Sequence, residues 1–190
     1  MKSSIHSISN PEETYISVDI EASGPIPSKY SMLSLGACVV GNTTSNFYAE
    51  IKPINDLFVP EAIKISGFSL EHLKSVGLEP MAALKSFAEW IEYNSPDKIP
   101  IFVGYNAPFD WQFVNWYFHV YIGSNPFGIN AIDIKAYYMG VTGVEWSKTS
   151  SSNLPAWLEV ENKEKHNALS DAIYQSIIFE RLLRYNSDKK

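Results

Sequence analysis

The stretch from Tyr15 to Glu21 combines the pattern of an apolar strand with two acidic residues at its end. Successive side chains of a strand point to opposite faces, so Asp19 and Glu21 share one face. Val18 and Ile20 lie on the other face and are expected in the core. Neighbouring carboxylates repel each other unless a cation lies between them, and Mg²⁺ or Mn²⁺ prefers oxygen ligands. The pair therefore predicts either a divalent-metal site or, where the strand simply ends in solvent, two hydrated acids.

Length and charge limit the kind of protein this chain can form. It has 190 residues, 45% apolar and 19% charged, which is enough for one well-packed core. We expect a single domain over residues 1–190, with a core from about 15 to 184 and short polar termini. The net charge of -6 predicts that a nucleic-acid partner is held locally, by metal ions or a few lysines, rather than by a basic surface.

The only cysteine and the polar N-terminus bear on the location of the protein. Cys38 lies in an apolar run, so we expect a buried strand residue rather than a nucleophile, and no intramolecular disulfide can form. No apolar run approaches the roughly 20 residues of a membrane span. Residues 1–10 form a polar leader without the apolar centre of a signal peptide. These features predict a cytoplasmic protein with no membrane partner.

The order of the predicted elements favours an α/β fold. In the first half they are a strand ending at Glu21, a Gly- and Pro-rich loop at 22–29, a hairpin of strands at 31–40 and 45–52, a helical turn capped by Ser69 and a helix at 81–93. In the second half they are a buried strand at 99–105, a helix from Asn106 through Phe118, a strand at 129–134, a short helix at 135–139, a polar connection at 140–153, a helical turn at 154–158, a charged loop at 159–165 and an amphipathic helix at 167–185.

Two acids lie at predicted junctions between strands and helices. Asp110 is in the first turn of a helix for which Asn106 offers a cap. Ligands of open α/β sheets collect at such junctions, so Asp110 is a candidate third carboxylate; the alternative is an acid that only complements the helix dipole. Asp133 follows a short strand, and we expect it to cap the next helix rather than to serve a site.

A histidine and an acid open the last predicted helix, in the sequence His166-Asn-Ala-Leu-Ser-Asp171. Histidine takes and gives protons near neutral pH, so it suits a general base that activates water beside metal ions. Asp171 would be a fourth carboxylate at the same site. The remaining three histidines have no comparable pattern of acids around them.

Three motifs therefore follow one another: D-x-E at Asp19 and Glu21, N-x-x-F-D ending at Asp110, and H-x-A-x-x-D from His166 to Asp171. In this order they resemble the DEDDh branch of the DnaQ-like 3′-to-5′ exonucleases, which includes RNase T and oligoribonuclease. The resemblance extends over nearly the whole chain. It implies a ribonuclease H-like fold, with a mixed five-stranded sheet whose first three strands form an antiparallel meander, flanked by helices.

The resemblance also implies a site that holds two divalent metal ions, Mg²⁺ or Mn²⁺. The implied ligands are Asp19, Glu21, Asp110 and Asp171, and the implied general base is His166. Two ions about 4 Å apart can stabilise both the attacking and the leaving oxygen of an in-line phosphoryl displacement. The expected reaction removes nucleoside 5′-monophosphates one at a time from the 3′ end of single-stranded DNA or RNA, or of short oligonucleotides.

Further positions are implied to contact substrate, namely Ser23, Gly24, Phe68, Asn106 and Phe109. Ser23 and Gly24 follow the D-x-E motif, where family members often touch the terminal nucleotide through backbone groups, although a simple turn is an equal alternative. Phe68 is expected either to stack on the terminal base or to pack in the core, with neither favoured. Asn106 and Phe109 flank Asp110 and are expected to line the same pocket.

Two other classes of function are compatible with these residues. One is a catalytically silent module of the same fold that binds nucleic acid or another partner, and the other is a phosphohydrolase of small nucleotides. The presence of all five chemical residues argues against the silent module. The sequence does not separate DNA, RNA and very short oligonucleotides as substrates, and it leaves open whether the chain forms a homodimer.

Overall fold

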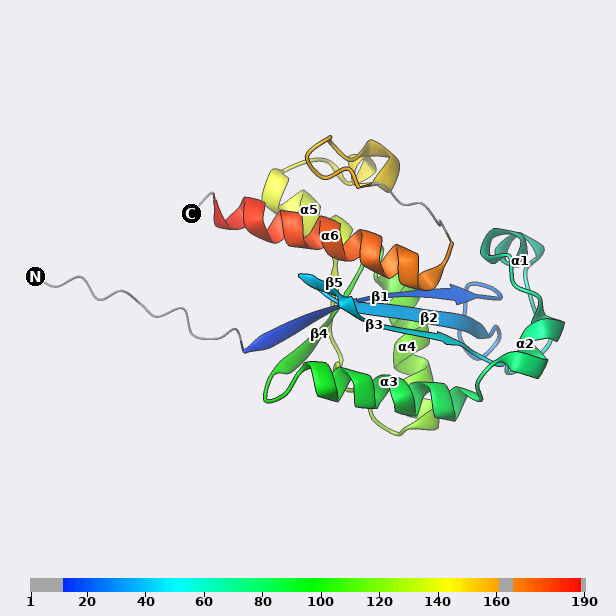
Figure 1. The fold of residues 1–190 in the computed structure, drawn as a ribbon. Helices are drawn as coiled ribbons and strands as arrows, with labels where there is room; N and C mark the ends of the chain where they lie inside the picture. Colours follow the sequence, from blue (N-terminus) through cyan, green and yellow to red (C-terminus); the bar gives the residue numbers. More distant parts are fainter. Residues whose placement is uncertain (1–11, 161–165, 189–190) are drawn as a thin grey trace, which may run out of the picture.

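The computed structural model describes residues 12–160 and 166–188, which fold around one five-stranded sheet (Figure 1). The strands lie in the order β3-β2-β1-β4-β5. They are β1 (Glu13–Ala22), β2 (Met32–Val39), β3 (Asn42–Glu50), β4 (Ile99–Gly104) and β5 (Ala131–Asp133). The first three form an antiparallel meander, whereas β4 runs parallel to β1 and β5 runs parallel to β4. The mixed sheet and its meander, predicted from the sequence, are confirmed.

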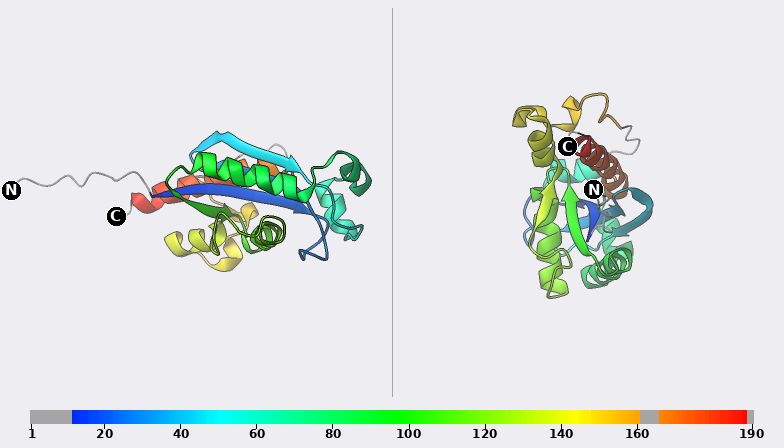
Figure 2. Two further views of the ribbon diagram at one scale, coloured as in Figure 1. Left: turned by 90° about the horizontal axis from the view of Figure 1, so that it is seen from below. Right: turned by 90° about the vertical axis from the view of Figure 1, so that its left-hand side faces the viewer.

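Helices cover both faces of this sheet (Figure 2). On one face lie α3 (Pro80–Asn94) and α4 (Pro108–Tyr121), and on the other lie α5 (Ile134–Thr142) and α6 (Ala168–Ser187). Val18 and Ile20 of β1 are buried in the core with α3 and α4, as the strand alternation predicts. The opposite side of β1, which carries Asp19, therefore faces α6.

A glycine lets α6 approach the sheet closely. Gly36 of β2 pairs with Asp19 of β1. A Cβ atom on Gly36 would lie 2.2 Å from the Ala168 carbonyl carbon and 2.3 Å from the Leu169 nitrogen. The first turn of α6 thus rests directly on the backbone of β2, beside Asp19. Cys38 of the same strand is fully buried, as predicted.

The end of the molecule at the right of Figure 1 carries two short helices, α1 (Pro60–Ser66) and α2 (Leu70–Val76). The predicted cap of the second is confirmed, because the Ser69 hydroxyl accepts a hydrogen bond from the His72 N–H. The first was not predicted. It has seven residues and buries none of them, so it is too short for helical periodicity to reveal it in the sequence.

Two further predictions about helices are corrected. Asn106 does not cap α4: its backbone is left-handed, with φ of 67°, and the residue before the helix is Ala107, without a side-chain cap. The predicted connection at 140–153 begins inside α5 and contains two 3₁₀ turns, η1 (Trp146–Lys148) and η2 (Ser151–Asn153). The predicted polar leader and residues 161–165 of the charged loop lie outside the described residues.

Among the described helices, none combines the length and the apolar character needed to cross a membrane.

Candidate active site

The end of β1 places two acids on the face of the sheet that α6 covers. Asp19 and Glu21 are both half-buried, and the intervening Ile20 points into the opposite core. The predicted shared face of the two carboxylates is thereby confirmed.

Asp110 joins them from the first turn of α4. Its side chain is only 4% exposed, and its Oδ1 accepts a hydrogen bond from the Ile20 N–H at 3.1 Å. Since Ile20 lies between Asp19 and Glu21, this bond fixes the α4 acid against the acidic end of β1.

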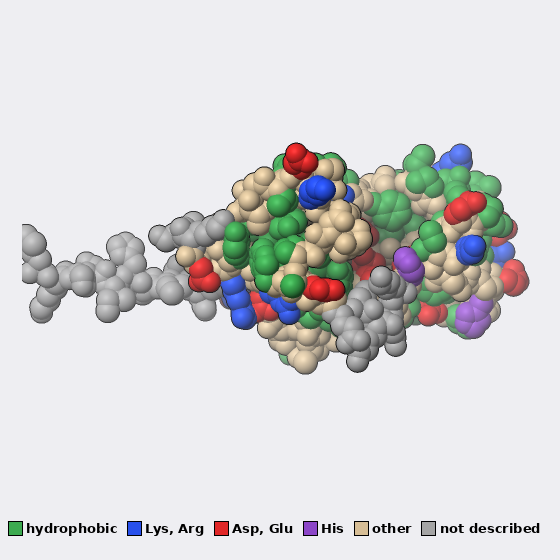
Figure 3. Space-filling model, turned by 90° about the horizontal axis from the view of Figure 1, so that it is seen from above, with side chains coloured by type: hydrophobic (Ala, Val, Ile, Leu, Met, Phe, Trp, Pro, Cys, Tyr) green, Lys and Arg blue, Asp and Glu red, His purple; other side chains and the backbone are tan. Residues whose placement is uncertain are grey.

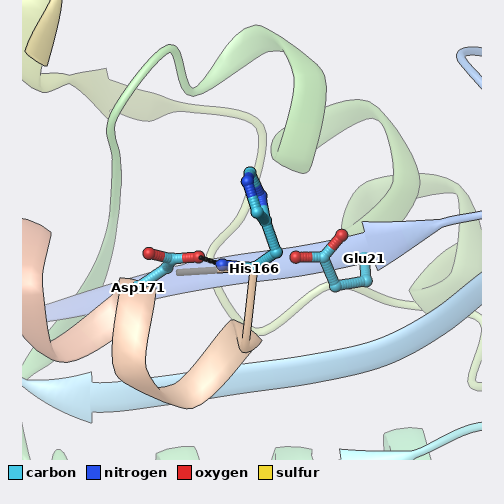
Figure 4. Close-up of side chains that lie close together, drawn as sticks. All are labelled: Glu21, His166 and Asp171. Carbon is cyan, nitrogen blue, oxygen red and sulfur yellow. Dashed lines mark hydrogen bonds between the residues drawn. The ribbon is translucent and has the colours of Figure 1, made fainter. Parts of the chain in front are cut away.

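The start of α6 brings in the last two residues (Figure 4). Asn167 caps the helix, accepting a hydrogen bond from the Ser170 N–H at 3.1 Å. Asp171 Oδ2 accepts one from the His166 backbone N–H at 2.8 Å. This contact holds His166 in a left-handed conformation, with φ of 64°, and its ring stands beside the carboxylate of Glu21.

These side chains form one cluster. Ligand atoms of Glu21, His166 and Asp171 all lie within 4.8 Å of one another. On the surface, acidic side chains lie at the bottom of a hollow beside a histidine, next to the end of the molecule that carries α1 and α2 (Figure 3).

Burial and mutual repulsion raise the pKa values of three of the acids. Burial, followed by the charges of Asp171 and Asp110, raises the pKa of Glu21 to about 8. Burial also raises the pKa of Asp110 to about 7, against the hydrogen bonds that its carboxylate accepts from backbone N–H groups. The pKa of Asp19 lies well above its usual range, first because of burial and then because of Asp110 and its other acidic neighbours.

A site of this kind fits divalent cations. Burial and then the acidic neighbours raise the pKa values of Asp19 and Glu21, and a cation among the carboxylates would relieve the repulsion. The carboxylate oxygens are hard donors, which Mg²⁺ and Mn²⁺ prefer. Asp19, Glu21, Asp110 and Asp171 could hold metal on these grounds, and His166 lies close enough to Glu21 and Asp171 to join them.

A pocket of about 530 Å³ extends from this cluster along α6. It begins at His166 and Asp171, and its wall continues through Ser151, Ser152, Leu154, Glu159, Val160 and Tyr174. The pocket joins the acid cluster to the surface between α6 and η2, and so leaves room for a ligand beside the acids.

Ser23 and Gly24 have neighbours within the protein. Ser23 is fully buried, and its hydroxyl donates to the Leu57 carbonyl at 2.9 Å while accepting from the Ser31 N–H at 2.9 Å. Its backbone carbonyl accepts from the Val59 N–H at 2.7 Å. A Cβ on Gly24 would lie 2.5 Å from the ring of Tyr30. These contacts place Ser23 and Gly24 in the wall beside the end of β1, and the expected contact with substrate stays a prediction.

Phe68, Asn106 and Phe109 were also expected to contact substrate, and these contacts stay predictions. Phe68 is half-buried between α1 and α2. Asn106 is exposed, and the half-buried ring of Phe109 packs 5.6 Å from that of Phe113. Asp133 caps α5 as predicted, accepting from the Lys135 N–H at 3.2 Å, and it also accepts from the Asn106 N–H at 3.0 Å.

Two buried polar residues of the site region were missed in the sequence. Ser17 donates to the Ala172 carbonyl of α6 at 2.8 Å. Gln175 of α6 is 1% exposed and bonds to backbone groups of β1 and of the segment after β4. The signal for Gln175 was its spacing, because it lies four residues after Asp171 and hence on the same face of the helix.

A family model and a protein of known activity both match most of this chain. The RNase T family model, described as Exonuclease, matches residues 16–179. The 3′-5′ DNA exonuclease Cap18 of Escherichia coli is 48% identical over 180 residues, which cover 94% of this chain and 96% of that protein.

Solved structures are similar in fold at lower identity. The nuclease domain of 3′hExo, described as a DEDDh family member bound to rAMP, has a TM-score of 0.73 and 18% identity over 90% of this chain and 92% of its own. Escherichia coli Exonuclease I in complex with a dT13 oligonucleotide has a TM-score of 0.70 and 17% identity over 93% of this chain and 42% of its own.

Proposed function

Since the chain belongs to the Exonuclease family of RNase T-like proteins, we propose that it removes nucleotides one at a time from the 3′ end of single-stranded DNA. The resemblance and the class of activity predicted from the three motifs, a 3′-to-5′ exonuclease, are confirmed by this membership. The choice of DNA is supported by the name of the Escherichia coli relative. The match of the family model to residues 16–179 supports the proposal of a single exonuclease domain.

The observation that carries the proposal is the convergence of four carboxylates from β1, α4 and α6. Enzymes of this family use divalent metal ions, and Asp19, Glu21, Asp110 and Asp171 are proposed to hold two of them, Mg²⁺ or Mn²⁺. When bound, such a pair stabilises negative charge on the attacking and leaving oxygens of a phosphodiester.

His166 is proposed as the general base. In Figure 4 its ring stands between Glu21 and Asp171, and its backbone N–H donates to Asp171, so the ring is held next to the acids. The ring takes a proton from a water molecule whose oxygen attacks the terminal phosphodiester. The bond from phosphorus to the 3′ oxygen of the preceding nucleotide breaks, and a nucleoside 5′-monophosphate leaves.

The wall opposite α6 is proposed to receive the terminal nucleotide. Ser23 ties the segment from Leu57 to Val59 to the end of β1, two residues beyond Glu21. Phe58 in this segment is 51% exposed, and Phe68 follows α1. An aromatic ring at this wall would stack on any base, which fits an enzyme that removes nucleotides without regard to sequence.

The experiment is a degradation assay with purified protein and Mn²⁺ on a 3′-labelled single strand of DNA, the matching RNA and a dinucleotide. Release of labelled mononucleotide from DNA, faster than from RNA, is expected. A blocked 3′ end should stop the reaction, and a circular strand should stay intact. Equal or faster cleavage of RNA would contradict the DNA proposal, and cuts in the circular strand would identify an endonuclease.

A further inference from the structure

Gln175 is a buried amide one helical turn after Asp171. Its side chain is 1% exposed, and a primary amide at such a position is costly unless its polar atoms are hydrogen-bonded. Both ends of the amide are bonded to backbone. Nε2 donates to the Val18 carbonyl at 2.9 Å, and Oε1 accepts from the Tyr105 N–H at 2.5 Å.

The two backbone groups belong to neighbouring parallel strands at the point where these separate. The pairing of β1 with β4 ends at Ser17 and Val103. In a parallel pair, a carbonyl accepts from the N–H that follows its partner residue, so one more step would join Val18 directly to Tyr105. The Gln175 amide lies between these two groups instead and completes the hydrogen bonding that the separated strands have lost.

The separation opens the space for the acids. Beyond Gln175, the next β4-facing backbone group of β1 is the Ile20 N–H, which donates to Asp110 Oδ1 at 3.1 Å. Asp19 lies between Val18 and Ile20, and Tyr105 begins the turn that leads into α4. The width of the gap therefore fixes how far the acids of β1 lie from the acid of α4.

We propose that Gln175 is a positioning residue, whose amide sets the separation of β1 and β4 and thereby the placement of Asp19 relative to Asp110. The inference rests on the proposed exonuclease function. It assigns Gln175 no contact with substrate or metal. Its effect passes through the backbone of Val18 and Tyr105 to the carboxylates of the site.

The test is kinetic, on a 3′-labelled single strand of DNA with saturating Mn²⁺. Gln175→Leu keeps the approximate volume and removes both hydrogen bonds. Because misplacement of catalytic groups lowers the rate of a bound complex, kcat should fall at least about ten-fold while KM changes by less than about three-fold. Exchange of the Tyr105 amide hydrogen with deuterium, followed by mass spectrometry, should become faster.

Tyr117→Phe is the matched control. It removes the fully buried hydroxyl that accepts from the Met32 N–H at 2.8 Å, another bond between a helix and a strand. A similar loss of thermal stability is expected, with kcat within about two-fold of the wild type. A Gln175→Leu enzyme with kcat within about two-fold of wild type, or one that loses no more kcat than Tyr117→Phe, overturns the inference.

Gln175→Met serves where the leucine variant does not fold. It is unbranched and uncharged and also removes both hydrogen bonds, so the Tyr105 amide should exchange faster and kcat should fall at least about ten-fold. An unchanged kcat would sink the proposed bridge. A wild-type protein that releases no nucleotide would instead refute the proposed function, and exchange at Tyr105 in the Gln175 variants would still test the bridge.

Discussion

At the scale of single residues, substitution of a proposed metal ligand should have a different effect from substitution of His166. The first should remove both Mn²⁺ binding and turnover, and the second mainly turnover. Asp19→Ala or Asp171→Ala removes a proposed metal ligand and should abolish turnover together with Mn²⁺ binding measured by calorimetry. Activity within about three-fold of the wild type would contradict the assignment of either acid. Ser75→Ala, on exposed surface in α2, is a suitable control that should change neither quantity.

His166→Ala should give a different result. Loss of a general base lowers the rate by about 10²–10⁴-fold, and Mn²⁺ affinity should be largely kept, because the carboxylates remain. Calorimetric titration of the variant with Mn²⁺, beside its turnover rate, distinguishes the two roles. Parallel loss of affinity and rate would make the ring a metal ligand, which its closeness to Glu21 and Asp171 would allow.

The acids also predict how stability depends on pH in metal-free protein. Glu21 has a pKa of about 8 in the fold against an ordinary value of 4.5, and that of Asp110 is raised to about 7. Between the ordinary and the raised pKa values, the folded protein thus binds more protons than the unfolded chain. The free energy of unfolding therefore falls as pH rises through this range. The stabilisation is complete below about pH 4 and is lost through about pH 8.

Thermal unfolding in EDTA from pH 5 to 8 measures this slope. The melting temperature should fall over the range, and Mn²⁺ should raise it most at pH 8, where the carboxylates are ionised. Glu21→Gln or Asp110→Asn should flatten the decline. A melting temperature that rises steadily through this range without metal would refute the raised pKa values.

At the scale of elements, we expect the close approach of α6 to β2 to be essential for both stability and turnover. Gly36→Ala would place a methyl group within 2.2 Å of the α6 backbone, and backbone cannot rotate out of the way as a side chain can. We expect a loss of about 1–3 kcal/mol in stability and a fall in kcat, because Asp171 moves with the helix. Gly140→Ala in α5 is the control, since a Cβ there meets nothing within 4 Å. Equal activity of the two variants would show that α6 can shift without harm to the site.

Local patterns were sufficient to predict much of this arrangement. The alternation in β1 is a property of a few consecutive residues, and it correctly placed Asp19 and Glu21 on one face and Ile20 on the other. The three motifs each lie at the end of a strand or the start of a helix, which parallel strands of an α/β sheet bring to one edge. The hairpin of strands at 31–40 and 45–52 also followed from local patterns, whereas the mixed sheet with its meander was implied by the family resemblance.

What the sequence did not predict depends on tertiary contacts. The roles of Ser23 and Gln175 follow from which backbone groups are left without a partner where strands end or separate. No local pattern encodes such gaps. Helix α1 escaped prediction for a related reason, because it lies on the surface and buries no side chain.

At the scale of the whole molecule, charge predicts how the enzyme engages a strand. The net charge is -6, and several basic residues in the described parts of the chain already have partners. Lys52 pairs with Glu79 at 2.6 Å, Lys74 with Asp56 at 2.5 Å and Arg184 with Glu180 at 2.5 Å. Because the chain is acidic overall, we expect recognition to concentrate on the 3′ end rather than on an extended phosphate backbone.

A shallow dependence on salt and on strand length should result. For single strands the logarithm of affinity falls with slope of about 0.7 per neutralised phosphate, so contact with about two phosphates predicts a slope near 1.4. Substrate affinity, measured as Kd with Ca²⁺ in place of Mn²⁺, gives this slope directly over a series of NaCl concentrations.

Strands of different length with one 3′ sequence should be degraded with similar kcat/KM. Products of partial digestion should form a continuous ladder, because we expect the enzyme to release the strand between cuts. A slope that corresponds to five or more phosphates, or kcat/KM that rises with length, would instead require a basic path along which the strand stays bound.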